Sequence, residues 1–205
     1  MKTSNYILSA LFIFITVSLL VLFISAIDHK YKPTLSCEIH SPNSINIIIV
    51  EDCASDIKIQ TSNKSSLSIN WPKDENEPVN FYSIQNDTLF IFGQICQSQN
   101  ISINDISVER LTSVIAKNNQ CINFQHFNSD TTLHINTVNS KIKLKNSSIK
   151  EVVIHADKSN IYTHNTIFSS LSVELNNESI YNGNLISIKK INLKTDKNSK
   201  IILPE

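Results

Sequence analysis

The stretch from Leu111 to Leu203 decides the fold, because one pattern returns in it about every twenty residues. Its copies begin Leu111-Thr-Ser-Val-Ile-Ala116, Asp130-Thr-Thr-Leu-His-Ile135, Ile149-Lys-Glu-Val-Val-Ile154, Phe168-Ser-Ser-Leu-Ser-Val173 and Ile188-Lys-Lys-Ile-Asn-Leu193. Steps of 19, 19 and 20 residues separate the aliphatic anchors Leu133, Val152, Leu171 and Ile191. A fixed period with a constant polarity pattern indicates a repeat architecture.

From the second copy on, a polar turn and a second short apolar run complete each repeat. These runs are Asn139-Ser-Lys-Ile-Lys-Leu144, Lys158-Ser-Asn-Ile-Tyr162, Glu178-Ser-Ile-Tyr181 and Asn198-Ser-Lys-Ile-Ile-Leu203. The turn serines step by 19, 20 and 20 residues, at Ser140, Ser159, Ser179 and Ser199. Asparagine and serine suit such turns in a chain with only two glycines, because asparagine tolerates left-handed backbone angles.

Alternating residues give each run a period of two, which is typical of a half-buried β-strand. A coil of two or three such strands can close on itself, and stacked coils pair strand to strand. The sequence therefore predicts an all-β fold, a single-stranded parallel β-solenoid with right-handed coils. Two internal aliphatic ladders are expected, one from Leu133, Val152, Leu171 and Ile191, the other from Ile142, Ile161, Ile180 and Ile201.

Two details qualify this prediction. Cys121 stands where later copies have serine, so we interpret 114–124 as a diverged first coil. A leucine-rich repeat is the alternative, because Ile188-Lys-Lys-Ile-Asn-Leu193 fits its opening. That architecture needs a helix or an asparagine ladder in the second half of each repeat, where this chain has β-branched alternation, so it is disfavoured.

Composition favours an ordered globular protein and gives no sign of nucleic-acid binding. Of 205 residues, 41% are hydrophobic and 18% are charged, which is not the composition of a disordered chain. The formal net charge is zero, whereas nucleic-acid binding requires a basic face.

The amino terminus predicts a membrane partner. A short tail, 1–5, precedes the uncharged run 6–27, which is long enough to cross a bilayer as a helix. A cleaved signal peptide has a shorter apolar core, of about 7–15 residues, so a retained transmembrane signal-anchor is favoured. We interpret 28–44 as a stalk and expect the remaining domain, 45–205, to be exported to the periplasm or cell surface.

An amino-terminal β part, 45–108, precedes the repeats of 109–205. Its segments Asp56-Ile-Lys-Ile-Gln60 and Asn86-Asp-Thr-Leu-Phe-Ile91, followed by the serine turns, resemble the auto-transporter adhesin head (GIN) domain family of exported, mostly Bacteroidetes, proteins. The family's turns carry glycine, which the serine turns of this chain lack. The resemblance implies a parallel β-solenoid, export and no established catalytic activity.

No residue pattern predicts an enzyme, a metal site or a cofactor site. His134 and His155 are expected to point outward from neighbouring coils at different repeat positions, which does not form a metal site. The positions between the strand anchors are His134, Val153, Ser172 and Asn192, so no pair of carboxylates emerges for glycan cleavage. A polysaccharide-processing enzyme therefore remains a weak alternative.

The cysteines are the candidate covalent sites. Cys37, Cys53, Cys96 and Cys121 all lie in the part expected to be exported, where disulfides are possible. Pairing between chain neighbours gives Cys37–Cys53 and Cys96–Cys121, and buried free thiols are the alternative.

The leading functional prediction is a non-catalytic binding or structural module of the cell envelope. An envelope glycan or a protein is the expected partner. A lysine row (Lys141, Lys143, Lys145 and Lys189) could meet an anionic glycan, although such a row is more often a solvated face. The aromatic residues Phe81, Tyr82, Phe90 and Phe92 could form a binding patch, but core packing of the amino-terminal β part is favoured for them. The alternative is a self-assembly or adhesion module. Its homo-oligomer would form through an uncapped carboxyl-terminal coil end at Ile201, Ile202 and Leu203.

Overall fold

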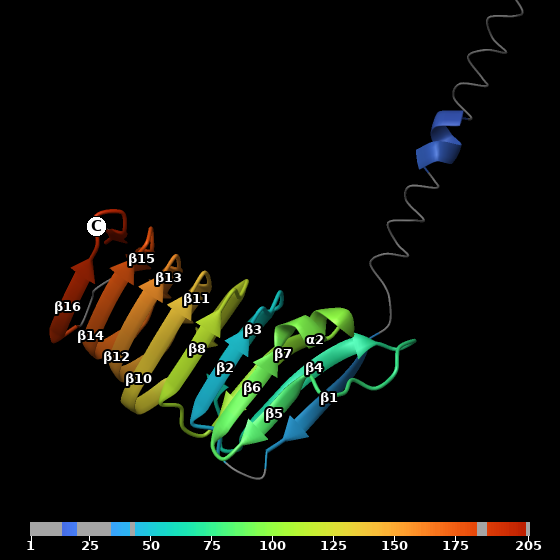
Figure 1. The fold of residues 1–205 in the computed structure, drawn as a ribbon, viewed down its shortest axis with the longest axis horizontal. Helices are drawn as coiled ribbons and strands as arrows, with labels where there is room; N and C mark the ends of the chain where they lie inside the picture. Colours follow the sequence, from blue (N-terminus) through green and yellow to red (C-terminus); the bar gives the residue numbers. More distant parts are fainter. Residues whose placement is uncertain (1–13, 20–33, 42–43, 184–187, 204–205) are drawn as a thin grey trace, which may run out of the picture.

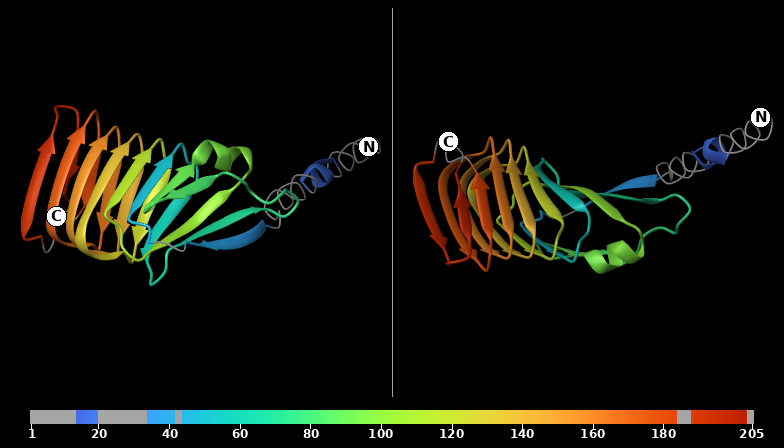
Figure 2. Two further views of the ribbon diagram at one scale, coloured as in Figure 1. Left: turned by 60° about the horizontal axis from the view of Figure 1, so that its bottom comes forward. Right: turned by 90° about the horizontal axis from the view of Figure 1, so that it is seen from above.

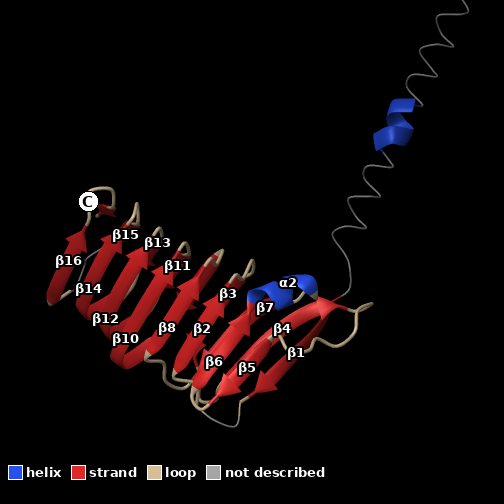
Figure 3. Cartoon of the chain, viewed as in Figure 1, coloured by secondary structure: helices blue, strands red, loops and turns tan. Residues whose placement is uncertain are grey.

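The computed structural model describes residues 14–19, 34–41, 44–183 and 188–203. Apart from the helical residues 14–19, these form one elongated stack of β-coils (Figure 1). Strands dominate, and the six-residue helix α2 (Gly93–Ser98) lies near one end of the stack (Figure 3). The predicted all-β solenoid is confirmed.

Two long sheets run along the stack, as the views in Figure 2 show. Sheet A contains, in spatial order, β1 (Thr34–His40), β4 (Ser66–Pro72), β7 (Ser102–Val108), β3 (Asp56–Thr61), β9 (Cys121–Gln125), β11 (Lys141–Lys145), β13 (Asn160–His164), β15 (Ile180–Gly183) and β17 (Lys200–Ile202). Sheet B contains β16 (Lys190–Thr195), β14 (Ile167–Asn176), β12 (Ser148–Asp157), β10 (Asn128–Val138), β8 (Ser113–Lys117), β2 (Ile47–Glu51), β6 (Thr88–Phe92) and β5 (Tyr82–Gln85).

The repeats stack in parallel register, so equivalent residues pack directly on one another. Leu133 pairs with Val152, Val152 with Leu171, and Leu171 with Ile191, which confirms the first predicted ladder. The first three anchors are almost fully buried. Such a column removes apolar area from water at every coil, which stabilises the stack by about 25 cal/mol per Å².

The second predicted ladder is wrong at one rung. Ile142 pairs with Ile161, but Ile161 then pairs with Tyr181 instead of Ile180, and Tyr181 pairs with Ile201. The cause is an extra turn residue: Asn177 and Glu178 both have left-handed backbone angles, with φ of 54° and 70°. This extra residue shifts the strand by one position, and Tyr181 enters the core fully buried.

The corners of the coils are built by asparagine where glycine would be usual. Asn118, Asn139, Asn146 and Asn165 all have φ between 48° and 53°. Buried serines lie in three successive corners, at Ser140, Ser159 and Ser179, and the hydroxyl of each accepts a hydrogen bond from the coil before it. The backbone N–H of Ser140 donates to Ser159 Oγ at 3.1 Å, and the N–H of Ser159 donates to Ser179 Oγ at 3.1 Å.

Asn119, and not Cys121, takes the serine's place in the first coil of the repeats. The N–H of Asn119 donates to Ser140 Oγ at 2.9 Å, so it starts the serine ladder. The pairing of Ile122 with Ile142 brings Cys121 level with Lys141, because this corner contains one more residue than the next. The predicted first coil exists, but the alignment of its cysteine was wrong.

The chain does not stack its coils in sequence order. The coil of β2 and β3 lies between the later coil of β6 and β7 and the first repeat coil of β8 and β9. Antiparallel strands β1, β4 and β5 cover this end of the stack. The stalk prediction for 28–44 was therefore wrong over Thr34–His40, which is strand β1, because its alternating Leu35, Cys37 and Ile39 pair with β4.

The predicted membrane helix 6–27 falls mostly outside the described residues. Residues 14–19 are helical. Within the described part of the chain, no helix has the length and apolarity needed to cross a membrane. The signal-anchor therefore stays a prediction.

Candidate functional site

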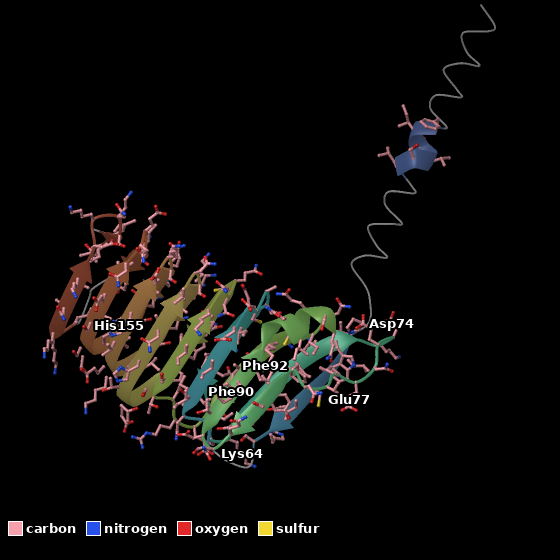
Figure 4. All side chains as sticks on the ribbon, viewed as in Figure 1. Lys64, Asp74, Glu77, Phe90, Phe92 and His155 are labelled. Atoms are coloured by element: carbon pink, nitrogen blue, oxygen red, sulfur yellow. The ribbon has the colours of Figure 1, made fainter. Side chains whose placement is uncertain are left out.

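The outer face of sheet B changes character along the stack. One row of outward residues runs through paired positions of β6, β2, β8, β10, β12, β14 and β16, in the order Phe90, Ile49, Ile115, Asn136, His155, Glu174 and Lys194. The first three are apolar and the last four are polar. Figure 4 shows Phe90 on β6 and His155 on β12, on the same face of the sheet. The apolar part is therefore a local feature of three strands.

The next outward row supplies one more aromatic ring and an ion pair. Phe92 pairs with Glu51, and Glu51 pairs with Lys117. Phe92 is 41% exposed, which is high for a side chain of its size on a sheet. Lys117 Nζ lies 2.8 Å from Glu51 Oε1, and both side chains are about half exposed. The two rows enclose a depression of about 220 Å³, here called the aromatic depression, lined by Ile49, Glu51, Phe90, Ile91, Phe92, Ile115 and Lys117.

A second depression continues from the first past Phe92. Its volume is about 260 Å³, and it shares Glu51 and Phe92 with the aromatic depression. Its other wall is formed by Asp52 and the start of helix α2. Gln94 Nε2 donates to Asp52 Oδ2 at 2.9 Å, which fixes the amide at this wall.

This arrangement has the features of a ligand-binding surface. Ligand sites are commonly apolar platforms with a few polar groups that set orientation. Here Phe90 and Phe92 offer the platform, while Glu51, Lys117 and Gln94 offer an acceptor, a cationic donor and an amide. The larger depression of about 550 Å³ near the starts of β10, β12 and β14 has no aromatic residue in its lining.

The predicted aromatic set divides between core and surface. Phe81 is buried and Tyr82 packs partly buried against the core, with their ring centroids 4.9 Å apart. Only Phe90 and Phe92 remain as surface candidates. The sequence signal for the site was the loss of alternation in Ile45–Val50 and in Leu89-Phe-Ile-Phe92, a pattern that is also typical of strands buried on both faces. The structure instead buries Ile48 and Val50 and turns Ile49 outward.

The predicted lysine row is only partly assembled. Lys141, Lys143 and Lys145 alternate with buried residues on the outer face of β11, on the opposite sheet from the aromatic depression. Lys141 Nζ lies 5.2 Å from the centre of the Tyr162 ring, a cation–π distance. Lys189 lies in the last coil just before β16 and does not join this row.

The histidines lie where the repeat predicted. His134 pairs with Val153, and His155 pairs with Asn136, so the two side chains occupy different rows. His155 Nδ1 lies 3.3 Å from Glu174 Oε2. No group of three or more metal-ligating side chains occurs among the residues that the structure describes.

The four cysteines are free thiols in the structure. Cys37 is exposed on edge strand β1, whereas Cys53, Cys96 and Cys121 are buried. Burial raises the pKa of Cys121, while nearby Lys143 opposes that shift. The fold places Cys53 beneath helix α2, which carries Cys96, so it brings together a pair that chain-neighbour pairing did not predict.

The residues predicted for self-association lie on the last coil. Ile201 is half-buried, and Ile202 and Leu203 are each 46% exposed. Strands β16 and β17 each pair on one side only, as far as the described residues show. Self-association itself stays a prediction.

The fold and the site define a β-solenoid with a partly aromatic surface depression. A crystal structure described as a putative adhesin, from Bacteroides fragilis, shares this fold. It aligns with a TM-score of 0.58 and 12% identity, over 85% of this chain and 98% of that chain. The predicted solenoid fold therefore also occurs in a Bacteroidetes protein that is described as a putative adhesin.

Two further crystal structures with the same description align less well. The one from Parabacteroides merdae has a TM-score of 0.33 and 10% identity, covering 84% of this chain and 96% of that chain. The one from Parabacteroides distasonis has a TM-score of 0.37 and 11% identity, covering 84% and 94%. No model of a protein family matches the sequence, so none confirms a GIN domain, and no curated protein matches it either.

Proposed function

We propose that the protein is a non-catalytic, adhesion-like binding module whose aromatic depression holds a saccharide of the cell envelope. The observation that carries the proposal is the apolar run Phe90, Ile49 and Ile115, in a row of outward positions that is polar over the rest of the sheet. In the later repeats the equivalent outward positions are polar. An apolar row that is only half-buried is instead typical of a contact surface.

The chemistry of the lining favours a sugar ring over a purely apolar ligand. A pyranose presents a face of C–H groups, which can stack on Phe92, and a rim of hydroxyl groups. Glu51 can accept hydrogen bonds from that rim, and Lys117 and Gln94 can donate to it. The fold similarity to a protein described as a putative adhesin supports a binding role.

Binding of the full-length chain, in detergent, to an array of neutral and anionic oligosaccharides tests the proposal. Phe92→Ala removes the more exposed aromatic ring of the depression and should weaken binding about tenfold or more, the range of an aromatic hot spot. Tyr162→Ala is the matched control, because it removes an aromatic ring from the outer face of sheet A.

Three outcomes are distinguishable. If Phe92→Ala loses saccharide binding and Tyr162→Ala retains it, the result supports the aromatic depression as the binding site. The reverse pattern, with binding restricted to anionic sugars, would move the site to the lysine face of β11 and overturn the proposal. If no saccharide on the array binds the protein, the proposal that its ligand is a sugar is wrong.

We also infer that residues 6–27 anchor the module in a membrane, with the solenoid exported. The uncharged length of the run supports this inference. Protease treatment of intact cells that carry a tag after Glu205 provides the test. Loss of the tag places the solenoid on the outer surface. Protection that ends when the outer envelope is opened places it in a periplasmic space, and protection beyond that step contradicts export.

A further inference from the structure

Cys53 occupies a tightly held corner between β2 and β3. Its side chain is almost fully buried. Its backbone N–H donates to Asn119 Oδ1 at 3.1 Å, and its carbonyl accepts from the N–H of Gln120 at 3.0 Å. The first repeat coil therefore fixes the backbone of Cys53 from one side of the stack.

Helix α2 lies over the same corner from the other side. A Cβ on Gly93 would lie 2.5 Å from the backbone nitrogen of Cys53, so only glycine allows this approach. Gln97 Nε2 donates to the carbonyl of Asp52 at 2.9 Å, next to the bond from Gln94 described above. Three residues of the short helix therefore hold it against Asp52 and Cys53.

Cys96 lies on the face of α2 that meets this corner. The buried residues of α2 are Gly93 and Cys96, which are three positions apart and therefore share one face. Residues at this spacing have Cβ atoms about 5–6 Å apart. Since a Cβ on Gly93 would meet the Cys53 backbone, and Cys53 affects the titration of Cys96, the two cysteines are neighbours across this corner. A disulfide requires a Cα separation of about 4.4–6.8 Å.

The electrostatics agree with two neighbouring thiols. Burial, with a smaller contribution from the nearby Cys53, raises the pKa of Cys96 to about 12. Burial also raises the pKa of Cys53. Both groups are therefore protonated thiols at neutral pH, and neither has the low pKa of a catalytic cysteine.

We propose that Cys53 and Cys96 form a disulfide that locks helix α2 onto the β2–β3 corner. The oxidant is a disulfide donor, either a small-molecule disulfide or a dithiol oxidase in its disulfide form. Cys96 as thiolate attacks one donor sulfur and releases the first donor thiol. Cys53 as thiolate then attacks the Cys96 sulfur of the mixed disulfide and releases the second. Two cysteine thiols lose two electrons in total, and the donor gains them with two protons.

The buried, protonated state of both thiols sets when this reaction occurs. Thiolates are the attacking species, and the folded chain holds few of them at these positions. The crosslink should therefore form during folding, before α2 closes over the corner. Once formed, it should resist reduction until the helix opens.

The crosslink also bears on the candidate binding site, a consequence that rests on the proposed function. Gly93, Gln94 and Ile95 of α2 line the second depression beside Phe92. Fixing α2 would hold this wall in place before a ligand arrives, which lowers the ordering cost of binding. The crosslink itself is detectable without any ligand.

Refolding of the full-length chain from denaturant in a buffer of reduced and oxidised glutathione tests the proposal. Alkylation, digestion and mass spectrometry without reduction should show one pair of peptides, joined through Cys53 and Cys96. Cys37 and Cys121 should be alkylated. The combined Cys37→Ser and Cys121→Ser variant keeps both partners and should form the same crosslink.

Thermal unfolding supplies the second readout. The oxidised protein should melt about 5–10 °C higher than the same protein after reduction, and Cys53→Ser should abolish that difference. Folded protein in which Cys53 and Cys96 are both alkylated would overturn the proposal. Pairing of either residue with Cys37 or Cys121 would overturn it as well.

Discussion

At the scale of single residues, the fold depends on side chains that replace glycine at the corners. Asparagine at most corners, and Lys158 at one, supplies the left-handed angle, and a serine closes the corner with two hydrogen bonds. Ser159 shows both bonds: its hydroxyl accepts the N–H of Ser140 and donates to the carbonyl of Asp157 at 2.7 Å. A buried N–H would otherwise lack a partner, which explains why a small hydroxyl recurs at every coil.

Replacement of a ladder serine should therefore destabilise the protein. Ser159→Ala leaves the buried N–H of Ser140 without an acceptor, and we expect the free energy of unfolding to fall by about 1–3 kcal/mol. Urea unfolding measures the loss. Ser169→Ala is the control, because that serine is exposed on the outside of β14 and should change stability by less than about 0.5 kcal/mol. Equal stability of the two variants would contradict the ladder.

At the scale of elements, charged pairs join the last two coils on the outer face of sheet B. Glu174 on β14 accepts from Lys194 Nζ on β16 at 2.8 Å, with His155 on its other side. The hydrogen bond from Lys194 is the first cause of a lowered pKa at Glu174, followed by the charge of that lysine. A carboxyl whose pKa is lowered by folding stabilises the fold above its unfolded pKa and loses that contribution as pH falls through its folded pKa.

A pH titration of Glu174 by NMR checks this pairing. In the wild type its pKa should lie below the ordinary value of 4.5, and Lys194→Met should bring it back toward that value. The attachment of β16 should accordingly weaken in the acid range, below about pH 4.5. Lys190→Met, on the same strand and exposed, should leave the pKa of Glu174 where it is. An unchanged pKa in Lys194→Met would refute the pairing.

The elements also separate what the sequence could predict from what it could not. Leu133, Val152 and Leu171 follow from local alternation and a constant step. Tyr181 could not be placed, because the extra residue at 177–178 changes the register without an evident change in period. Strand β1 and the order of the amino-terminal coils depend on pairing between residues far apart in the chain, which local patterns do not encode.

The site was harder to predict than the fold for the same reason. Its apolar row needs Phe90, Ile49 and Ile115 side by side, and these come from three strands separated by some tens of residues in sequence. The apolar runs around Ile49 and Phe90 were visible in the sequence, but burial on both faces explained them equally well. Only the stacking order shows that one face of these runs meets solvent.

At the scale of the whole molecule, the two ends of the stack differ. Antiparallel strands cover one end, whereas the described part of the last coil leaves Ile191 and Ile202 more than 40% exposed. Open strand edges with apolar side chains favour pairing with another chain. Lysines at Lys190, Lys194 and Lys200 on the same coil oppose contact between two copies of this end.

Weak self-association through this end is the resulting prediction. Sedimentation at high protein concentration should show association that Ile202→Lys weakens about tenfold or more, because it places a further charge on the edge. Added salt should strengthen association of the wild type by screening the lysines. A clean monomer at every concentration and salt level, unchanged by Ile202→Lys, would rule out this assembly.

The central claim is that the outward apolar face of β6, β2 and β8 binds a saccharide. The most direct measurement is an NMR titration of the isoleucine-methyl-labelled full-length chain with the saccharide selected on the array. We predict that the methyl signals of Ile49 and Ile115 shift first and saturate together, while those of buried Ile142 and Ile154 remain in place. Shifts confined to other parts of the stack, with Ile49 and Ile115 unaffected, would contradict the claim.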